Sequence, residues 1–304
     1  MLEVNRVDQC FRTGFWMRKT QVLHDVTLSI PKKSVFGFLG ANGAGKTTLI
    51  HLIVGLKRQT RGWVKIAGYE AHTPQAKARV GYLPERPYFY EHLTGQEFLF
   101  YVGALSGMDH SQVQAKIPQI FSRVGLSNAN RLELRRYSKG MLQRIGLAQA
   151  ILHDPEFLVL DEPMSGLDPV GRKEIRDLLV QLASEGKTIF FSSHIIPDVE
   201  AICDQVAMIE KGRLIGCGPI GQFLAMGKVQ TEIAFKGVSL SEVEKFTDFE
   251  SIRQIPDGIR AMVSSQEAVS RALALLLRAR AQILWVTPVR PSLESFFEKE
   301  VSHG

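Results

Sequence analysis

A glycine-rich segment that ends in lysine and threonine is the clearest chemical signal in the sequence. Residues 40–47 read GANGAGKT and match the pattern G-x-x-x-x-G-K-[ST]. The apolar run VFGFL precedes them and an apolar helical pattern, residues 49–56, follows them, which is the context that the motif requires. Backbone N–H groups of such a turn bind phosphate, together with the positive end of the following helix. The phosphate-binding residues predicted from this motif are Gly40, Ala41, Asn42, Gly43, Ala44, Gly45, Lys46, Thr47 and Thr48.

Two side chains of this segment add a charge and a metal ligand. We expect Lys46 to place its ammonium near the β and γ phosphates of a nucleotide. The Thr47 hydroxyl suits Mg²⁺, which prefers octahedral oxygen ligands and usually keeps several waters. Glycine-rich strand-to-helix turns also occur without a nucleotide, but the Gly-Lys-Thr ending in this context favours nucleotide binding.

Two adjacent carboxylates follow a second apolar run in a Walker B arrangement. Residues 157–163 read FLVLDEP, so Asp161 and Glu162 come just past the end of a buried strand. Asp161 is expected to hold the metal through a water molecule. Glu162 is expected to orient the water that attacks the γ-phosphate or to accept its proton. An acidic loop without function is the alternative, and the phosphate-binding segment makes it the weaker interpretation.

A histidine ends a third apolar run. His194 follows TIFF and two serines, and in a parallel sheet this strand end emerges at the same edge as the phosphate-binding segment. A lone histidine is usually structural. The shared sheet edge nevertheless predicts that His194 contacts the γ-phosphate or orients the attacking water, so Glu162 and His194 are the predicted catalytic pair.

Together with three further segments, these motifs resemble the ATP-binding cassette family over residues 2–225. Residues 137–141 read YSKGM where the family has its signature LSGGQ, and Gln143 and Arg144 follow on a helix. The resemblance implies a homodimer in which Ser138 and Gly140 of one copy cover the γ-phosphate of ATP held by the other. Residues 165–168, SGLD, look like the D-loop that lines the dimer interface and links the two sites.

Two further family features depart from the usual pattern or stay open. Residues 81–85, GYLPE, look like the Q-loop, but Glu85 stands in place of glutamine. A carboxylate also binds metal or water, so the predicted Mg²⁺ ligands are Thr47, Asp161 and Glu85. The family often stacks an aromatic ring on adenine, and here Phe11, Phe15 and Trp16 compete, with Trp16 favoured.

Three adjacent aromatic residues, YFY at 88–90, follow the Q-loop segment. Aromatic residues are enriched in the cores of interfaces. In the family this region receives a coupling helix of the membrane partner, which is one interpretation of the cluster. The other is that these side chains complete the core of the helical insertion.

The elements that position these residues are predicted from apolar runs that alternate with helical patterns. This alternation indicates an α/β, P-loop NTPase-type fold with a mainly parallel sheet, antiparallel strands and a helical insertion at about 92–151. Within the insertion, residues 95–125 are expected to be helical, with a break at Pro118. The ATP-binding domain is expected to span 1–226. Residues 227–304 form a small α+β accessory domain of order β-α-β-β-α-β, closed by a last helix.

The composition of the chain limits the classes of protein to which it can belong. With 304 residues, 45% hydrophobic and 22% charged, the chain is expected to form two globular domains. No apolar stretch approaches the roughly 18 residues of a membrane span, and the amino terminus lacks a signal peptide core. The three cysteines form no C-x-x-C pair, which disfavours zinc and redox functions. The net charge of +6 is scattered along the chain, so nucleic acid is not an expected partner.

The predicted function is ATP- and Mg²⁺-dependent hydrolysis that drives a separate integral membrane permease. The chain is expected in the cytoplasm, peripheral on the cytoplasmic face of the membrane. Its carboxyl-terminal domain, Pro84-Glu85 and the Ser-Lys-Gly-Met signature resemble cassettes of the exporter group, which implies export. A soluble ATPase of this family without a transporter and a regulatory cassette with little hydrolysis are the alternatives.

Overall fold

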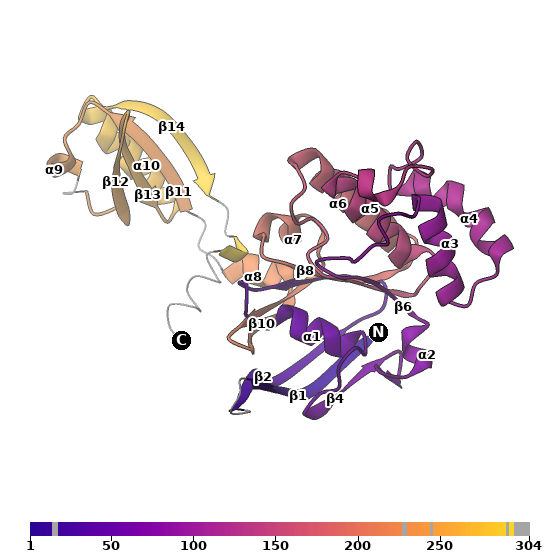
Figure 1. The fold of residues 1–304 in the computed structure, drawn as a ribbon. Coiled ribbons are helices and arrows are strands. Elements are labelled where there is room, and N and C mark those ends of the chain that lie inside the picture. Colours follow the sequence, from indigo (N-terminus) through magenta and orange to yellow (C-terminus); the bar gives the residue numbers. More distant parts are fainter. Residues whose placement is uncertain (14–17, 227–229, 244–245, 290–291, 295–304) are drawn as a thin grey trace. The chain divides into compact units, whose positions relative to one another are not determined.

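The computed structural model describes residues 1–13, 18–226, 230–243, 246–289 and 292–294, in two compact units (Figure 1). The first unit is Met1–Ile220 and the second is Gly221–Gly304. Among the described residues, no helix combines the length and the apolar composition that crossing a bilayer requires.

A six-stranded sheet forms the centre of the first unit. Its strands, in spatial order, are β10 (Arg213–Pro219), β9 (Gln205–Glu210), β3 (Val35–Leu39), β8 (Thr188–Ser193), β7 (Phe157–Leu160) and β6 (Val80–Leu83). All neighbours are parallel except β10 and β9. Every residue of β3, β7 and β8 is buried, because helices or a second sheet cover both faces of the central sheet.

Helices lie over one face of this sheet, and a layer containing α1 lies over the other (Figure 1). The first group includes α5 (Lys139–Ile151), α6 (Pro169–Ser184) and α7 (Ile196–Ile202). On the opposite face, α1 (Lys46–Ile53) packs Leu49 and Ile50 into one core with Phe36 and Phe38 of β3. The strand–loop–helix unit that carries GANGAGKT is therefore held rigidly at both ends.

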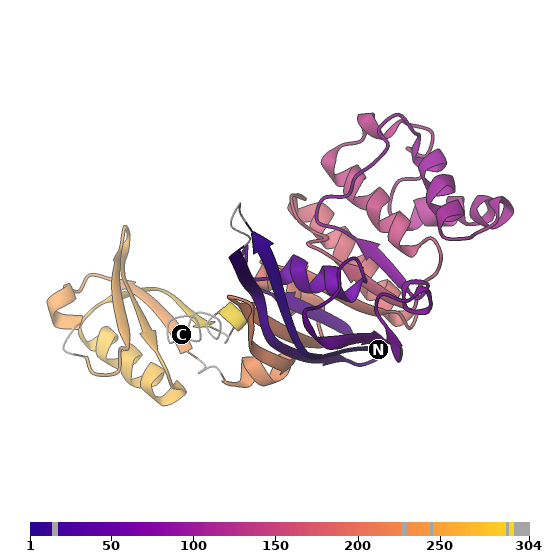
Figure 2. The same cartoon turned by 60° about the horizontal axis from the view of Figure 1, so that its bottom comes forward.

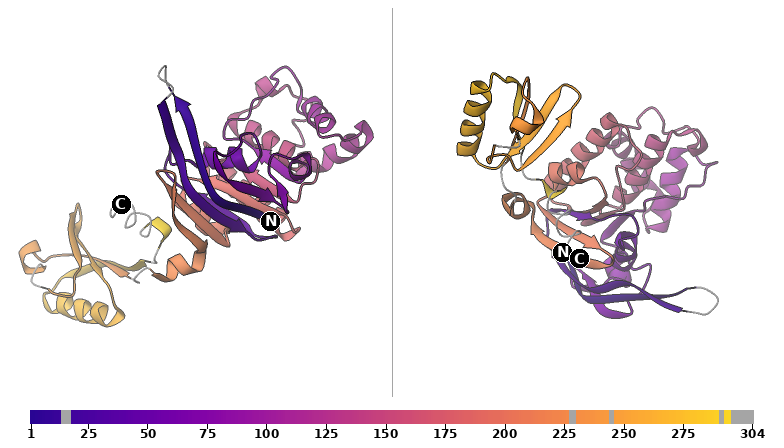
Figure 3. Two further views of the ribbon diagram at one scale, coloured as in Figure 1. Left: turned by 90° about the horizontal axis from the view of Figure 1, so that it is seen from below. Right: turned by 90° about the vertical axis from the view of Figure 1, so that its left-hand side faces the viewer.

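An antiparallel sheet completes the α1 side of the first unit. Its strands are β2 (Arg18–Ile30), β1 (Leu2–Thr13), β4 (Arg61–Ile66) and β5 (Tyr69–Glu70), with α2 (Pro74–Lys77) after β5. The long strands β1 and β2 run side by side (Figure 3), with Leu2 opposite Ile30. Their buried residues share the core of α1 and β3, so the predicted combination of parallel and antiparallel strands forms one domain core.

The helical insertion lies on the side of the first unit away from β1 and β2 (Figure 2). It contains α3 (Gly95–Leu105), α4 (His110–Arg123), the 3₁₀ turn η1 (Leu134–Arg136) and α5. The break predicted at Pro118 is wrong, because Pro118 lies inside α4. The chain leaves the helix earlier, where Gly107 adopts φ of +75°, and the Gln112 side chain accepts a hydrogen bond from Asp109 N–H at the start of α4.

The second unit contains one antiparallel sheet and, among the described elements, the helices α8, α9 and α10. After α8 (Ile220–Met226), the order is β11 (Gln230–Lys236), α9 (Leu240–Val243), β12 (Ser251–Ile255), β13 (Gly258–Val263), α10 (Gln266–Arg278) and β14 (Gln282–Val289). The spatial order is β12-β13-β11-β14, and α10 packs Ala268, Ala272 and Leu276 against it. The described elements follow the order β-α-β-β-α-β. Most of the last predicted helix lies outside the described residues.

Candidate active site

The glycine-rich loop between β3 and α1 presents backbone amides to one point. Gly43 and Gly45 adopt φ of +81° and +110°, which residues with a Cβ rarely adopt. No side chain caps α1, so the N–H groups of its first turn are left for a ligand. Free amides at the positive end of a helix bind anions such as phosphate.

A turn that is distant in the sequence supports this loop through hydrogen bonds. Gly212, in the turn between β9 and β10, donates its N–H to the Ala44 carbonyl at 2.9 Å and accepts from His24 N–H at 2.9 Å. A Cβ atom on Gly212 would overlap the Val22 carbonyl, so only glycine fits there. In the sequence the Lys-Gly pair at residues 211–212 has the pattern of an ordinary turn, which gives no sign of a part in the site.

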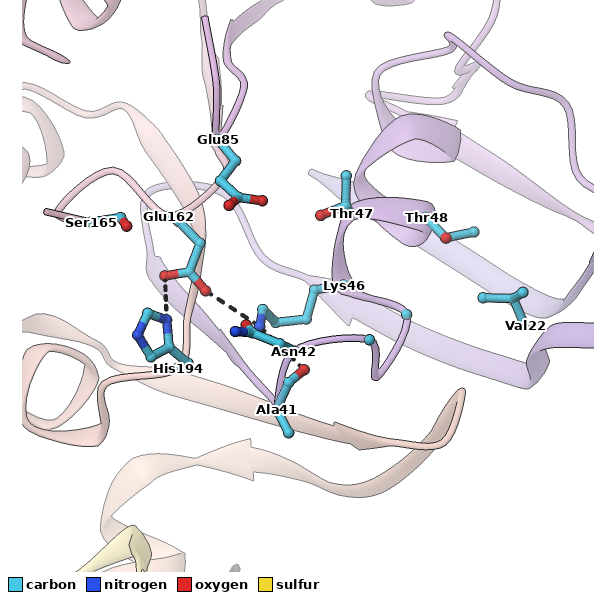
Figure 4. Close-up of a pocket in the computed structure, with 12 residues that line it drawn as sticks. Val22, Ala41, Asn42, Lys46, Thr47, Thr48, Glu85, Glu162, Ser165 and His194 are labelled. Carbon is cyan, nitrogen blue, oxygen red and sulfur yellow. Dashed lines mark hydrogen bonds and ion pairs between the residues drawn. The ribbon is translucent and has the colours of Figure 1, made fainter. Parts of the chain in front are cut away.

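The loop opens into a cavity of about 410 Å³ (Figure 4). The residues that line it, called the phosphate pocket from here on, are Val22, Ala41, Asn42, Gly43, Gly45, Lys46, Thr47, Thr48, Glu85, Glu162, Ser165 and His194. The cavity therefore brings together most of the predicted nucleotide, metal and catalytic residues from separate parts of the chain. Val22 is additional, because nothing in its local sequence marks it as a pocket residue, and Ser165 of the predicted D-loop also lines the cavity.

Lys46 is anchored at the base of the pocket. Its ammonium donates to the Gly40 carbonyl at 2.7 Å and lies 3.3 Å from Glu162 Oε1. Both side chains are over 90% buried, so the cation and the carboxylate neutralise each other where water has little access. A triphosphate entering the pocket offers Lys46 a second anionic partner.

Ser192 forms hydrogen bonds with both residues of the Walker B pair, with the carboxylate of Asp161 and with the backbone of Glu162. Its hydroxyl donates to Asp161 Oδ1 at 2.6 Å and accepts from Glu162 N–H at 2.9 Å. Glu162 has φ of +52°, an uncommon conformation for a residue with a side chain. The serine thus holds the chain in the turn that directs Glu162 into the pocket. Its role was missed from sequence, where it was only a residue at a strand end.

His194 contacts Glu162 directly. Its Nδ1 lies 2.9 Å from Glu162 Oε2, while the other oxygen of that carboxylate faces Lys46 (Figure 4). The two predicted catalytic side chains are therefore a hydrogen-bonded pair in the pocket. A carboxylate held between a histidine and a lysine can accept a proton, or a hydrogen bond from water, in one fixed orientation.

Asp161 has the character of a cation ligand. Burial raises the pKa of its carboxyl, hydrogen bonds from Ser192 and Thr47 oppose this shift, and the charges of Glu85 and Glu162 add to it. Among the described residues its Oδ2 is buried and has no hydrogen-bond partner. The described chain holds no group of three or more His, Cys, Asp or Glu that could bind a metal alone. One buried carboxylate beside a threonine hydroxyl fits Mg²⁺ shared with phosphates.

Comparison with known proteins identifies the family to which the chain belongs. The family model described as ABC transporter matches residues 23–165. An ABC transporter ATP-binding protein of Synechocystis sp. is 39% identical over 304 residues, which is 99% of this chain and 84% of that protein. This chain belongs to the ABC transporter ATP-binding proteins. It is an ATP-binding, ATP-hydrolysing cassette.

Other relatives cover both units or the first one. The bacitracin transport ATP-binding protein BcrA of Bacillus licheniformis is 32% identical over 284 residues, 92% of each protein. A solved ATP-binding subunit of an ABC transporter superposes with a TM-score of 0.65 at 29% identity, over 74% of this chain and 92% of that one. The dimeric structure of a bacterial ABC transporter cassette gives 0.67 at 20% identity, over 72% and 98%. The predicted α/β fold class is confirmed.

The signature segment of this ABC cassette, residues 137–141, lies outside the phosphate pocket. Ser138 begins α5, where its Oγ accepts a hydrogen bond from Met141 N–H at 3.2 Å. Ser138 is exposed and Gly140 half-buried, and neither lines the cavity. The fold thus separates these two predicted nucleotide contacts from the rest of the site.

The aromatic residues singled out from the sequence differ in where the structure places them. Trp16 and Phe15 lie outside the described residues, while Phe11 is half-buried with the Lys57 ammonium 4.5 Å from its ring centre. In the cluster at 88–90, Tyr88 is 91% exposed, whereas Phe89 is buried and packs against Phe98. The core interpretation therefore holds for Phe89, whereas Tyr88 takes no part in that core.

An ion-pair cluster joins the helices that follow the D-loop and His194. Asp198 on α7 is only 2% exposed, and it accepts a hydrogen bond from Arg176 on α6 at 2.9 Å. Arg172, also on α6, lies 3.9 Å away. This cluster connects α6, which begins after the D-loop, to α7, which begins after His194.

Replacement of Asp198 by alanine is expected to destabilise the cassette. Asp198→Ala removes a buried carboxylate and leaves two arginines unpaired, which costs at least about 2 kcal/mol after allowing for their partial exposure. Urea unfolding checks this, with Asp177→Ala, at an exposed position on α6, as the control. Equal unfolding free energies for the two variants would show that the cluster contributes nothing.

Proposed function

We propose that two copies of this chain close around two ATP molecules and drive export through a separate integral membrane permease. One observation supports the proposed pairing of two copies. The phosphate pocket gathers Lys46, Glu162 and His194, whereas Ser138 is exposed and Gly140 half-buried at the start of α5, and neither lines the pocket. A γ-phosphate in one pocket is therefore covered only when a second copy supplies its signature segment.

The residues have distinct roles in the proposed reaction. The amides of residues 40–48 and the Lys46 ammonium hold the triphosphate. Thr47, Asp161 and Glu85 would hold Mg²⁺, which would neutralise charge on the phosphates. Glu162 orients the attacking water and accepts its proton, and His194 fixes the carboxylate through the 2.9 Å contact.

The intact catalytic contacts favour hydrolysis over a purely regulatory role. A regulatory cassette needs only the phosphate-binding loop, whereas this chain also holds Glu162 between His194 and Lys46 at 2.9 and 3.3 Å. The left-handed conformation of Glu162 and the hydrogen bond from its N–H to Ser192 accompany a carboxylate that lines the pocket. Such a costly local conformation is typical of a functional site.

The direction of transport is inferred from a relative of similar length. BcrA, named as a bacitracin transport protein, matches 92% of this chain, including the second unit. Export is the direction that we propose by analogy with that protein. We place the chain on the cytoplasmic face of the membrane, where ATP is available and a permease presents its loops.

A groove in the helical insertion offers a surface for the permease. It encloses about 450 Å³ and is lined by Pro87, Tyr88, Phe89, Tyr90, Glu91, His92, Leu134, Arg135, Tyr137 and Leu142. Tyr88 is almost fully exposed at its rim, and Tyr90 hydrogen-bonds Tyr101 at 3.3 Å between their hydroxyls. Aromatic residues around a groove suit a short helix of a partner.

Replacement of Tyr88 by aspartate is expected to uncouple the cassette from its permease. Tyr88→Asp puts a charge at the rim of the groove, so permease that co-purifies from membranes should fall about tenfold, a typical effect for an interface aromatic. ATP hydrolysis by the free cassette should stay unchanged, because Tyr88 does not line the phosphate pocket. Tyr69→Asp, at an exposed tyrosine on β5, is the control. Undiminished co-purification of Tyr88→Asp, or recovery of ribosomes or DNA in place of a permease, would contradict the transport assignment.

A further inference from the structure

The signature segment of this cassette carries a lysine where LSGGQ has its first glycine. Lys139 is the first residue of α5, directly after the capping Ser138. A cation at this end of a helix is unfavourable, because the helix dipole favours anions there. The N–H groups of this first turn also have no partners within the helix. The start of α5 therefore combines a cation and free amides, both of which suit an anion.

No group within the described chain neutralises this cation. Lys139 is exposed, and no hydrogen bond or ion pair involves its ammonium among the residues that the structure describes. The nearest basic residue upstream with a carboxylate partner is Arg135, which pairs with Glu133. The ammonium of Lys139 therefore carries a charge that no ion pair within the described residues uses.

The D-loop supports the stem of Lys139. A Cβ atom on Gly166 would overlap Cε and Nζ of Lys139 and lie 3.2 Å from its Cδ, so the side chain lies across that glycine. A Cβ on the adjacent Gly140 would meet Leu167 at 3.5 Å. The same helix is fixed deeper in the core, where Gln143 donates to the Pro163 carbonyl at 2.9 Å. These contacts fix the start of α5 against the D-loop and place the Lys139 ammonium over Gly166.

The ammonium of Lys139 does not serve its own nucleotide. Ser165 of the D-loop lines the phosphate pocket of the same copy, but Lys139 does not. The hydroxyl oxygen of Ser138 accepts from Met141, which leaves the hydroxyl proton available to a further acceptor. The exposed surface at the start of α5 therefore presents only hydrogen-bond donors, which come from Lys139, Ser138 and the first amides of the helix.

We propose that Lys139 is a ligand of the triphosphate held by the opposite copy. The inference rests on the proposed pairing of two copies around ATP and adds to it a residue at which the family signature has no side chain. The charge of Lys139 contributes only when the copies are paired. A single copy binds ATP through its own loop and Lys46 without it.

Dimerisation in the Glu162→Gln background tests this proposal. The ATP concentration that gives half-maximal dimer is measured by sedimentation in the presence of Mg²⁺. Adding Lys139→Met, which keeps the unbranched stem and removes the charge, should raise that concentration about tenfold, the scale of one charge-assisted hydrogen bond. Lys139→Arg should stay within about threefold, since it keeps the charge. Lys173→Met, at an exposed lysine on α6, should change nothing.

Measuring nucleotide binding to single copies distinguishes a role of Lys139 as a ligand from a structural role. At protein concentrations too low for pairing, a fluorescent ATP analogue should bind equally well with and without Lys139→Met, and the melting temperatures should agree. The proposal is overturned if Lys139→Met dimerises at the same ATP concentration as Lys173→Met, or if it weakens single-copy binding to the same extent as dimerisation. If Glu162→Gln itself stays monomeric in saturating ATP, the proposed pairing fails and this inference fails with it.

Discussion

Glu162→Gln is expected to lower the rate of ATP hydrolysis by at least about 100-fold, the contribution typical of a positioned general base. The amide keeps the shape of the side chain and leaves the Glu162 N–H bond to Ser192 intact, but it cannot accept a proton from water. ATP binding should persist, because the loop and Lys46 are untouched. Phosphate release under saturating ATP and Mg²⁺ measures the loss, and size-exclusion chromatography should show a dimer that ATP stabilises.

A matched substitution on the same strand controls for the chemistry of the change. Glu156 precedes β7 at the end opposite to Glu162 and is exposed, and within the described part of the chain its carboxylate pairs only with Arg79, at 3.5 Å. Glu156→Gln should therefore hydrolyse ATP at the wild-type rate. If Glu162→Gln and the wild type release phosphate at equal rates, Glu162 is not the base. If both rates are negligible, the cassette is regulatory.

Mixing two inactive variants is expected to restore hydrolysis. Lys46→Ala removes the buried ammonium that bonds Gly40 and faces Glu162, so ATP affinity should fall about 100-fold or more. Ser138→Arg fills the exposed start of α5 with a bulky side chain and blocks closure in trans. Each variant alone should be inactive. In a mixed dimer, one pocket has an intact loop and an intact facing signature, so equal mixing should return about a quarter of wild-type sites.

The outcome of this mixing experiment depends on which copy supplies the signature. If Ser138 acted on the nucleotide of its own copy, each copy in the mixed dimer would still lack one requirement, and no activity would return. If Ser138→Arg alone hydrolysed ATP at the wild-type rate, the signature would not take part. Phosphate release, measured against the ratio of the two variants, distinguishes these cases, and the maximum should lie at equal amounts.

Short segments of sequence were sufficient to predict the chemistry of the pocket. GANGAGKT, the carboxylates after FLVL and the histidine after TIFF each combine residue type with a strand end. Because parallel strands end at one edge of the sheet, the pairs Leu39–Ser193 and Leu160–Phe191 bring the three segments together. Local chemistry and one rule of sheet geometry were therefore enough to predict that these residues meet.

Contacts between distant segments could not be predicted in the same way. Ser192 orients Asp161 and Glu162 from a neighbouring strand, and Gly212 braces the phosphate-binding loop from a turn 168 residues beyond Ala44. Neither residue has a local pattern that differs from an ordinary strand end or turn. Pro118 was wrongly expected to break a helix for a related reason, because the chain leaves the helix at Gly107 and a proline is accommodated within α4.

What the sequence by itself determined is the set of groups that can bind and cleave a triphosphate, because each motif carries its chemistry within a few consecutive residues. What only the tertiary structure decided is which groups share one cavity. It brought Glu85, Glu162 and His194 to the phosphate-binding loop and left Ser138, Lys139 and Gly140 outside it. That division depends on how α5 packs beside the D-loop. The side-chain contacts that fix this packing join separate segments of the chain, and the spacing of those segments in the sequence does not determine how far apart they lie in space.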